Sequence, residues 1–278
     1  MSDPAQLQAK QWDRRIERAR ELAAEYPFAR ELLVFYSELT AFQKDVYLDV
    51  QSSGATAAGN DGVLPLELER LSLAFLMPRF PPFLSMLERE GPATLAGFAR
   101  ALAERGPSAW TEVLASVQRR NELEPSSPAS FERFCAQAFL QPAMEYLARR
   151  ASLTPPAVRL PICPFCGSKP LAGVLRPEGE GAKRSLICAL CRTEWDYVRL
   201  TCPACEESRE ERLCVYTTAQ FEHVRVEACD TCHAYLKTID LGRNGLAVPE
   251  VDELAAVPLT LWADEHGYRK PTRNLLGL

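Results

Sequence analysis

The sequence predicts an α+β multidomain fold: an all-α N-terminal helical domain, then tandem four-cysteine β ribbons, then a C-terminal helix. Three observations support it. Apolar residues recur at helical spacing through the first half, short strand-like runs begin after residue 152, and eight of the ten cysteines form four Cys-x2-Cys pairs between residues 163 and 232. We therefore expect three parts: a helical domain over residues 1–155, a first ribbon over 156–200, and a second ribbon with the closing helix over 201–278.

The overall composition is that of a globular, mildly acidic protein. Of the 278 residues, 47% are apolar and 25% are charged, and the formal net charge is −5. No uncharged apolar run reaches about 18 residues, so we expect no membrane insertion. The segment from Met1 to Glu21 is charged throughout and lacks the apolar core of a secretory signal, which predicts a cytoplasmic protein.

Two apolar stripes predict the first two helices. One stripe has steps of four, three and four residues and consists of Trp12, Ile16, Ala19 and Ala23. The next has steps of three and four and consists of Leu32, Phe35, Leu39, Phe42 and Val46. Pro27 lies between them and suits the first turn of the second helix. Arginines on the first helix are expected to form a charged, exposed face: Arg14, Arg15, Arg18 and Arg20.

Further apolar periodicity predicts additional helices before residue 152. These segments are Leu66–Leu76, Pro81–Glu90, Ala93–Glu104, Ser108–Arg120 and Ser130–Arg150. Gly106 and Pro107 should break the chain between two of them, and Pro142 should kink or divide the last. Cys135 lies among phenylalanines on that last helix, so we expect a small core residue rather than a ligand.

After a Pro-containing linker, the predicted elements are strands. They are Leu171–Arg176, Arg184–Cys188, Glu194–Leu200, Arg212–Thr218, His223–Ala228 and Ala234–Leu241. Cys214 lies within one of them and is expected to be a core residue. Helical periodicity returns over Val251–His266, which predicts one closing helix.

The cysteines form an internal repeat of two copies. Each copy has two Cys-x2-Cys pairs, and corresponding cysteines are 39, 39, 41 and 41 residues apart. The four pairs are Cys163 with Cys166, Cys188 with Cys191, Cys202 with Cys205, and Cys229 with Cys232. A duplicated unit favours a sequential grouping, in which each copy completes its own site. A cross-braced grouping, with the first pair joined to the third and the second to the fourth, is the alternative.

Four thiolates drawn from two such pairs are expected to hold one metal ion. A Cys-x2-Cys segment curls into a tight turn, called a knuckle below, and two knuckles complete a tetrahedral site of four sulfurs that accepts zinc or iron. Zinc would make a zinc ribbon and iron a rubredoxin-like centre. The gaps of 21 and 23 residues between the pairs leave room for a β-hairpin. Gly167 follows the first knuckle, where a positive φ is often needed. Arg192, Glu206 and His233 follow the others, so those turns are expected to be strained or shaped differently.

Other uses of these cysteines fit less well. Disulfides are disfavoured in the reducing compartment that we expect. The run from Cys229 to His233 matches a haem c attachment signature, but haem would leave Cys202 and Cys205 without partners. His223 and His233 are expected to be surface residues or neighbours of the ligands. No phosphate-binding glycine loop or hydrolase motif occurs, so we do not expect an enzyme.

Two alternative functions follow from the ribbons themselves. A zinc-ribbon protein could bind nucleic acid, but residues 160–245 carry 11 Lys+Arg and 12 Asp+Glu, a balance of −1 that lacks a basic footprint. An iron-containing ribbon could instead be a small electron-transfer protein, for which the iron would have to be redox-active.

Four cysteine-containing runs resemble the formate dehydrogenase accessory protein FdhE family. They are residues 163–170 (CPFCGSKP), 188–195 (CALCRTEW), 198–205 (VRLTCPAC) and 227–237 (EACDTCHAYLK). The likeness extends loosely to the first helices and to the tail after Val251. One departure is His233, where the family is expected to carry glycine.

This resemblance implies a function. It implies a cytoplasmic maturation factor that binds the catalytic subunit of respiratory formate dehydrogenase before export and is required for an active enzyme. It also implies iron in two rubredoxin-like sites of four cysteines each. The ligands would be Cys163, Cys166, Cys188 and Cys191 for one ion, and Cys202, Cys205, Cys229 and Cys232 for the other.

Overall fold

The computed structural model describes residues 4–54, 75–115, 117, 127–151 and 160–277. The expected helix Leu66–Leu76 lies outside these residues except for its last two positions, and so does most of the linker before the first ribbon. Among the described residues, no helix combines the length and apolar character needed to cross a bilayer. The fold class is confirmed, since helices are followed by a sheet that carries two cysteine groups. The domain limits at 155 and 200 stay predictions.

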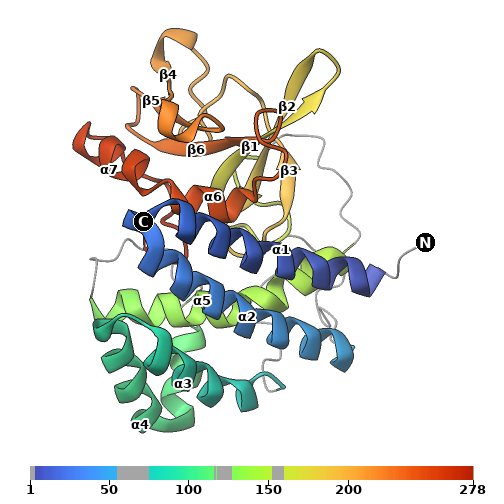
Figure 1. Ribbon diagram of the computed structural model, residues 1–278, viewed down its shortest axis with the longest axis vertical. Coiled ribbons are helices and arrows are strands. Elements are labelled where there is room, and N and C mark those ends of the chain that lie inside the picture. Colours follow the sequence, from blue (N-terminus) through green and yellow to red (C-terminus); the bar gives the residue numbers. More distant parts are fainter. Residues whose placement is uncertain (1–3, 55–74, 116, 118–126, 152–159, 278) are drawn as a thin grey trace.

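The N-terminal part is a set of helices that lies below the β region in Figure 1. Its elements are α1 (Pro4–Glu25), the 3-10 turn η1 (Pro27–Ala29), α2 (Arg30–Ser53), η3 (Met77–Arg79), α3 (Phe80–Glu90), α4 (Ala93–Ala115) and α5 (Pro128–Arg150). Both predicted stripes face inward: Trp12 and Leu39 are 1% and 0% exposed. The breaker at Gly106 is confirmed, because its φ of 78° interrupts α4.

Pro142 lies inside α5, which continues past it as one helix, so the division that we considered does not occur. A proline cannot donate the hydrogen bond to the carbonyl four residues earlier, here that of Ala138. Gln43 of α2 replaces that donor, since its Nε2 lies 2.6 Å from the Ala138 oxygen. A buried side chain of a neighbouring helix thus satisfies the carbonyl that the proline leaves free, and α5 continues as one helix.

The six predicted strands form one mixed sheet. They are β1 (Pro170–Glu178), β2 (Gly181–Cys188), β3 (Glu194–Asp196), β4 (Leu213–Tyr216), β5 (Val224–Cys229) and β6 (Tyr235–Asp240), in the order β3-β2-β1-β6-β5-β4. Each copy of the cysteine repeat supplies three antiparallel strands. The internal repeat is therefore a structural one, with two equal units placed side by side.

The two units join through parallel pairing of β1 with β6. Gly173 pairs with Thr238 there, and the register continues for two more residues. A Cβ atom on Gly173 would lie 2.3 Å from Thr238 Oγ1, so only glycine allows this close approach. The pairing of the two units thus depends on Gly173, a residue that the cysteine pattern does not mark.

The closing helical segment is two helices rather than the one expected. They are α6 (Pro249–Ala255) and α7 (Val257–Glu265). Ala256 has a ψ of 49° between them, and Pro258 lies in the first turn of the second helix. Leu259 and Ala263 of α7 pack on one face of the sheet with Val226 of β5.

The arginines of α1 contradict the prediction of a wholly exposed face. Arg15 and Arg18 are each only 7% exposed. Arg15 binds Glu145 of α5 through two hydrogen bonds of 2.8 and 3.0 Å, and it also pairs with Glu250 of α6. Arg18 donates to Asp252 at 2.6 and 3.1 Å. The charge pattern of one helix does not show which other helices pack against it. The prediction was therefore wrong: Arg15 and Arg18 lie in a junction between helices and not on a solvent-exposed face.

Candidate metal centres

All four Cys-x2-Cys knuckles share one backbone conformation. In each, the N–H of the first cysteine donates to the carbonyl five residues later, at 2.8–2.9 Å; the acceptors are Ser168, Thr193, Glu207 and Ala234. The residue after each knuckle has a positive φ: 69° at Gly167, 56° at Arg192, 60° at Glu206 and 56° at His233. Of the two alternatives expected for the other three turns, a different shape was wrong and strain is confirmed. Three knuckles hold a non-glycine residue in the left-handed region instead.

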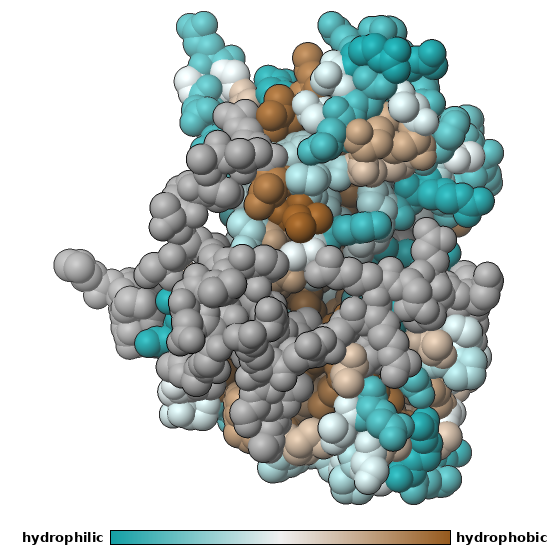
Figure 2. All heavy atoms as spheres, turned by 180° about the vertical axis from the view of Figure 1, so that it is seen from behind, coloured by the Kyte–Doolittle hydropathy of each residue, from teal (hydrophilic) through white to brown (hydrophobic). Residues whose placement is uncertain are grey.

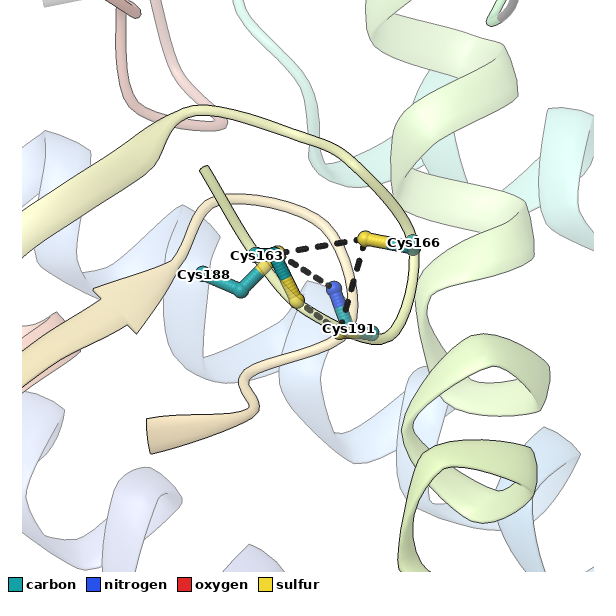
Figure 3. Close-up of side chains that lie close together, drawn as sticks. All are labelled: Cys163, Cys166, Cys188 and Cys191. Atoms are coloured by element: carbon teal, nitrogen blue, oxygen red, sulfur yellow. Dashed lines mark hydrogen bonds between the residues drawn. The ribbon is translucent and has the colours of Figure 1, made fainter. Parts of the chain in front are cut away.

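The first centre consists of Cys163, Cys166, Cys188 and Cys191. Figure 3 shows these side chains converging from two loops, one leading into β1 and one leaving β2. The Sγ atoms of Cys166 and Cys188 are 3.4 Å apart, and that of Cys191 lies 3.5 Å from both Cys163 and Cys166. All four side chains are buried and belong to the same apolar core as the N-terminal helices.

The second centre consists of Cys202, Cys205, Cys229 and Cys232. Its Sγ atoms are 3.7 Å apart between Cys202 and Cys232, and again between Cys205 and Cys229. Cys205 and Cys232 are exposed, whereas the other two are buried. The second centre therefore lies at the surface of the molecule.

The grouping is sequential: each copy of the repeat brings its own four sulfurs together, within 4.8 Å of one another. Sulfurs 3.4–3.7 Å apart are not disulfide-bonded, since an S–S bond is about 2.05 Å long. A tetrahedral ion with metal–sulfur bonds of about 2.3 Å needs sulfurs about 3.8 Å apart. Both centres come close to that requirement, so each could hold one metal ion. That the eight cysteines are ligands stays a prediction.

The electrostatics of the first centre also fit a cation. Burial raises the pKa of Cys188 and of Cys191 well above that of an ordinary thiol. Four thiolates would therefore not persist in this core without a positive ion among them. Backbone N–H groups offset part of the charge, since Leu190 and Cys191 lie 3.3 and 3.4 Å from the sulfur of Cys188.

The second centre is more exposed to solvent than the first, and its sulfurs have similar backbone N–H donors. Burial raises the pKa of Cys202 to about 11. The pKa of Cys229 is lowered instead, because backbone N–H bonds from Cys232 and Thr231 outweigh burial. The N–H of Ala204 lies 3.4 Å from the Cys202 sulfur. The N–H···S pattern is thus repeated in the second copy, which supports the same use of both centres.

The remaining cysteines and histidines take other places. Cys135 is 0% exposed in the helical core, as expected. Cys214 is only half-buried, and its sulfur lies 3.5 Å from Asp230, so it is not the core residue that we predicted. His223 lies 2.8 Å from Asp252, next to Arg18 in the α1–α6 junction. The haem alternative has no support, because Cys229 and Cys232 meet Cys202 and Cys205.

Charged residues beside the second centre had no signal in the sequence. Glu227 of β5 accepts hydrogen bonds from Arg184 of β2 at 2.7 Å and from Arg225 at 2.5 and 3.0 Å. These residues line a pocket of about 160 Å³ that also includes Cys202 and Cys229. Only the pairing of strands far apart in the sequence brings them together.

Comparisons with known proteins match both the β region and the whole chain. The family model described as FdhE, central domain, covers residues 162–199, and the one described as FdhE, C-terminal domain, covers residues 200–276. A protein named as an FdhE homologue in Aquifex aeolicus is 26% identical over 252 residues, 90% of this chain and 87% of that protein. An FdhE homologue from Klebsiella pneumoniae (strain 342) is 28% identical over 277 residues, 95% of this chain and 86% of that protein.

A solved structure has the same fold. The crystal structure of the FdhE protein from Pseudomonas aeruginosa matches with a TM-score of 0.59 and 25% sequence identity, covering 96% of this chain and 95% of that chain. The likeness therefore includes the N-terminal helices, which neither family model covers.

Proposed function

We propose that this chain, which belongs to the FdhE family, is an accessory protein that matures respiratory formate dehydrogenase in the cytoplasm. It would bind the catalytic subunit before export, through a β region stabilised by metal, and would itself catalyse no reaction. The client, respiratory formate dehydrogenase, is inferred from the resemblance of the four cysteine-containing runs to this family.

The observation that carries the proposal is the position of the second centre. Cys205 and Cys232 are exposed beside a pocket, whereas every sulfur of the first centre is buried against the helices. A docking module needs a rigid surface, and a β unit of about 40 residues cannot bury enough apolar area to be rigid unaided. Metal held by four sulfurs would supply that rigidity directly at the surface.

The proposed ligands are the two groups of four cysteines. Iron is favoured by the family resemblance, and zinc suits the same donors. Iron in such a site would supply a one-electron couple, whereas zinc would only hold the fold. Under either metal, the chain itself orients the sulfurs by its four knuckles and excludes water from the first centre.

A deletion strain tests the client assignment. We expect loss of respiratory formate dehydrogenase activity, restored by the wild-type gene on a plasmid. A plasmid carrying the double change Cys202→Ser and Cys205→Ser should not restore it. Normal enzyme activity in the deletion strain would contradict the proposal. Co-purification of the catalytic subunit with the tagged chain from the complemented strain gives the direct measurement of binding.

The exposed sulfurs also favour a second candidate function, electron transfer. Cys205 and Cys232 would place a bound iron close to solvent, where a donor or acceptor protein can approach it. A reversible visible spectrum of ferric thiolate in the purified chain would support this role. A colourless protein with two zinc ions would exclude it.

A further inference from the structure

A pocket next to the second centre lies on the sheet face away from α7. Arg225 and Glu227 alternate along β5 with Val224 and Val226, and the valines are buried under the closing helices. Side chains of alternate residues point to opposite faces of a strand, so the two charged residues face the pocket, which they line. The loop from residue 199 to residue 204, which carries the third knuckle, forms one wall.

The rim of this pocket is apolar and unprotected. Leu200 of the loop is 55% exposed, and Val215 of the edge strand β4 is 54% exposed. Both line the pocket, and Val198, at 39% exposed, lies two residues before Leu200. On the face seen in Figure 2, apolar side chains of the β region gather in small patches among hydrophilic ones. Leu200 and Val215 therefore form one exposed apolar rim and are not isolated surface residues.

The lining carries more positive than negative charge. Three arginines contribute, Arg184, Arg199 and Arg225, against one carboxylate, that of Glu227. Glu227 is shared by Arg184 and Arg225. Arg199 forms no hydrogen bond or ion pair within the part of the chain that the structure describes. A free guanidinium above an apolar rim fits a carboxylate, which it can bind in a bidentate manner.

The size of the pocket favours a side chain over a metabolite. Sites for small molecules usually enclose about 300–1,000 Å³. This pocket holds about 160 Å³, enough for one apolar side chain and little more. Nucleic acid is disfavoured as the occupant of the pocket, because residues 160–245 have a formal net charge of −1 and lack a basic surface.

We propose that this pocket binds a segment of the client protein in which an apolar residue stands beside an acidic one. The apolar side chain lies between Leu200 and Val215, and the carboxylate pairs with Arg199. This inference rests on the proposed function, since it identifies the surface of this chain, and the chemistry of the client segment, that bring the two together.

Four full-length variants test the pocket against the purified catalytic subunit of formate dehydrogenase. The pocket variants are Arg199→Glu and Leu200→Asp. Their controls are Arg243→Glu, an exposed arginine outside the pocket, and Leu261→Asp, whose 54% exposure matches that of Leu200. We expect each pocket variant to weaken binding by about tenfold or more, and each control to change it by less than about twofold.

Metal content and wild-type binding separate the other outcomes. Binding by the wild-type chain that all four variants retain would overturn the pocket and leave the proposed function standing. No binding by the wild-type chain would overturn the proposed function, and the pocket's occupant with it. Loss of metal from Arg199→Glu would also overturn the inference, because the arginine would then serve the charge of the second centre.

Discussion

The two cysteine centres have the same knuckles and opposite surroundings. The first is buried in the core that it shares with the N-terminal helices, and the second has two exposed sulfurs. The residue before the last cysteine of each knuckle explains the difference. Phe165 and Leu190 of the first copy are 1% and 4% exposed within that core. Ala204 and Thr231 occupy the equivalent positions in the second copy and are exposed.

The comparison teaches how one duplicated unit acquires two different surroundings. Phe165 and Leu190 pack the first centre against the N-terminal helices. We call this contact between the first ribbon and the helices the helix–ribbon joint. The small or polar counterparts of these two residues leave two sulfurs of the second centre exposed to solvent. The sheet and the knuckle geometry are common to both, so the difference lies in four side chains.

Removing one knuckle from each centre, in two separate variants, should give the largest difference between the centres. We expect the double change Cys163→Ser and Cys166→Ser to prevent accumulation of folded protein, because binding energy on the order of 10 kcal/mol would be lost from the shared core. The matched change, Cys202→Ser and Cys205→Ser, should leave a folded chain with one ion. Circular dichroism with elemental analysis measures both, and equal effects would contradict the difference between the centres.

Making the first knuckle resemble the third should also have a large effect. Phe165→Ala removes a buried aromatic ring from the helix–ribbon joint, and we expect a loss of about 3–5 kcal/mol in the free energy of unfolding. Ala204→Ser at the exposed counterpart should change it by less than about 0.5 kcal/mol. Denaturant unfolding measures both; a small effect of Phe165→Ala would mean that the joint does not depend on this ring.

Buried charges join the second ribbon to the closing helices, in addition to the apolar packing of α7 on the sheet. Glu253 of α6 is fully buried and pairs with Lys237 of β6 and with Lys270. Burial opposes its charge, yet the two ammonium groups outweigh burial and lower its pKa to about 2. This pairing stabilises the fold above the ordinary carboxyl pKa, and the stabilisation is lost as the pH falls towards 2.

Acid should therefore weaken this attachment. We expect Glu253 to contribute on the order of 3 kcal/mol at pH 7 and progressively less below about pH 5. Glu253→Gln lacks this contribution, so the difference in stability between wild type and variant should narrow as the pH falls. Urea unfolding from pH 7 to pH 3 measures it. A difference that does not change with pH would show that the lysines do not keep Glu253 charged.

The turns after the knuckles give the smallest expected effect. His233 has a φ of 56° and is exposed at the second centre, whereas Gly167 has a φ of 69° at the first. His233→Gly should stabilise the chain by up to about 1 kcal/mol, and Gly167→Ala should destabilise it by about that amount, because a Cβ atom is strained in this region. Denaturant unfolding measures both, and changes of the same sign would contradict the shared geometry of the knuckles.

Sequence reasoning found the parts of this fold that repeat locally. Cys-x2-Cys spacing predicted the two sulfur groups, and short strand-like runs predicted all six strands. Sequence reasoning could not find the parallel pairing of β1 with β6 at Gly173, because this pairing joins residues 65 positions apart (173 to 238). It misjudged Arg15, because the carboxylates that pair with it lie on α5 and α6. The small Ala204 and the polar Thr231 indicate that the second centre is exposed. This signal emerges only when the two copies of the repeat are compared position by position.

Metal release under native conditions tests the central claim most directly. The wild-type chain is purified without oxygen, its metal is quantified, and a chelator is added while thiol labelling is followed by mass spectrometry. Two ions per chain are expected, one released early with labelling of Cys205 and Cys232, and one retained until the chain unfolds. Fewer than two ions, or release of both at a single rate with no order among the cysteines, would contradict the account.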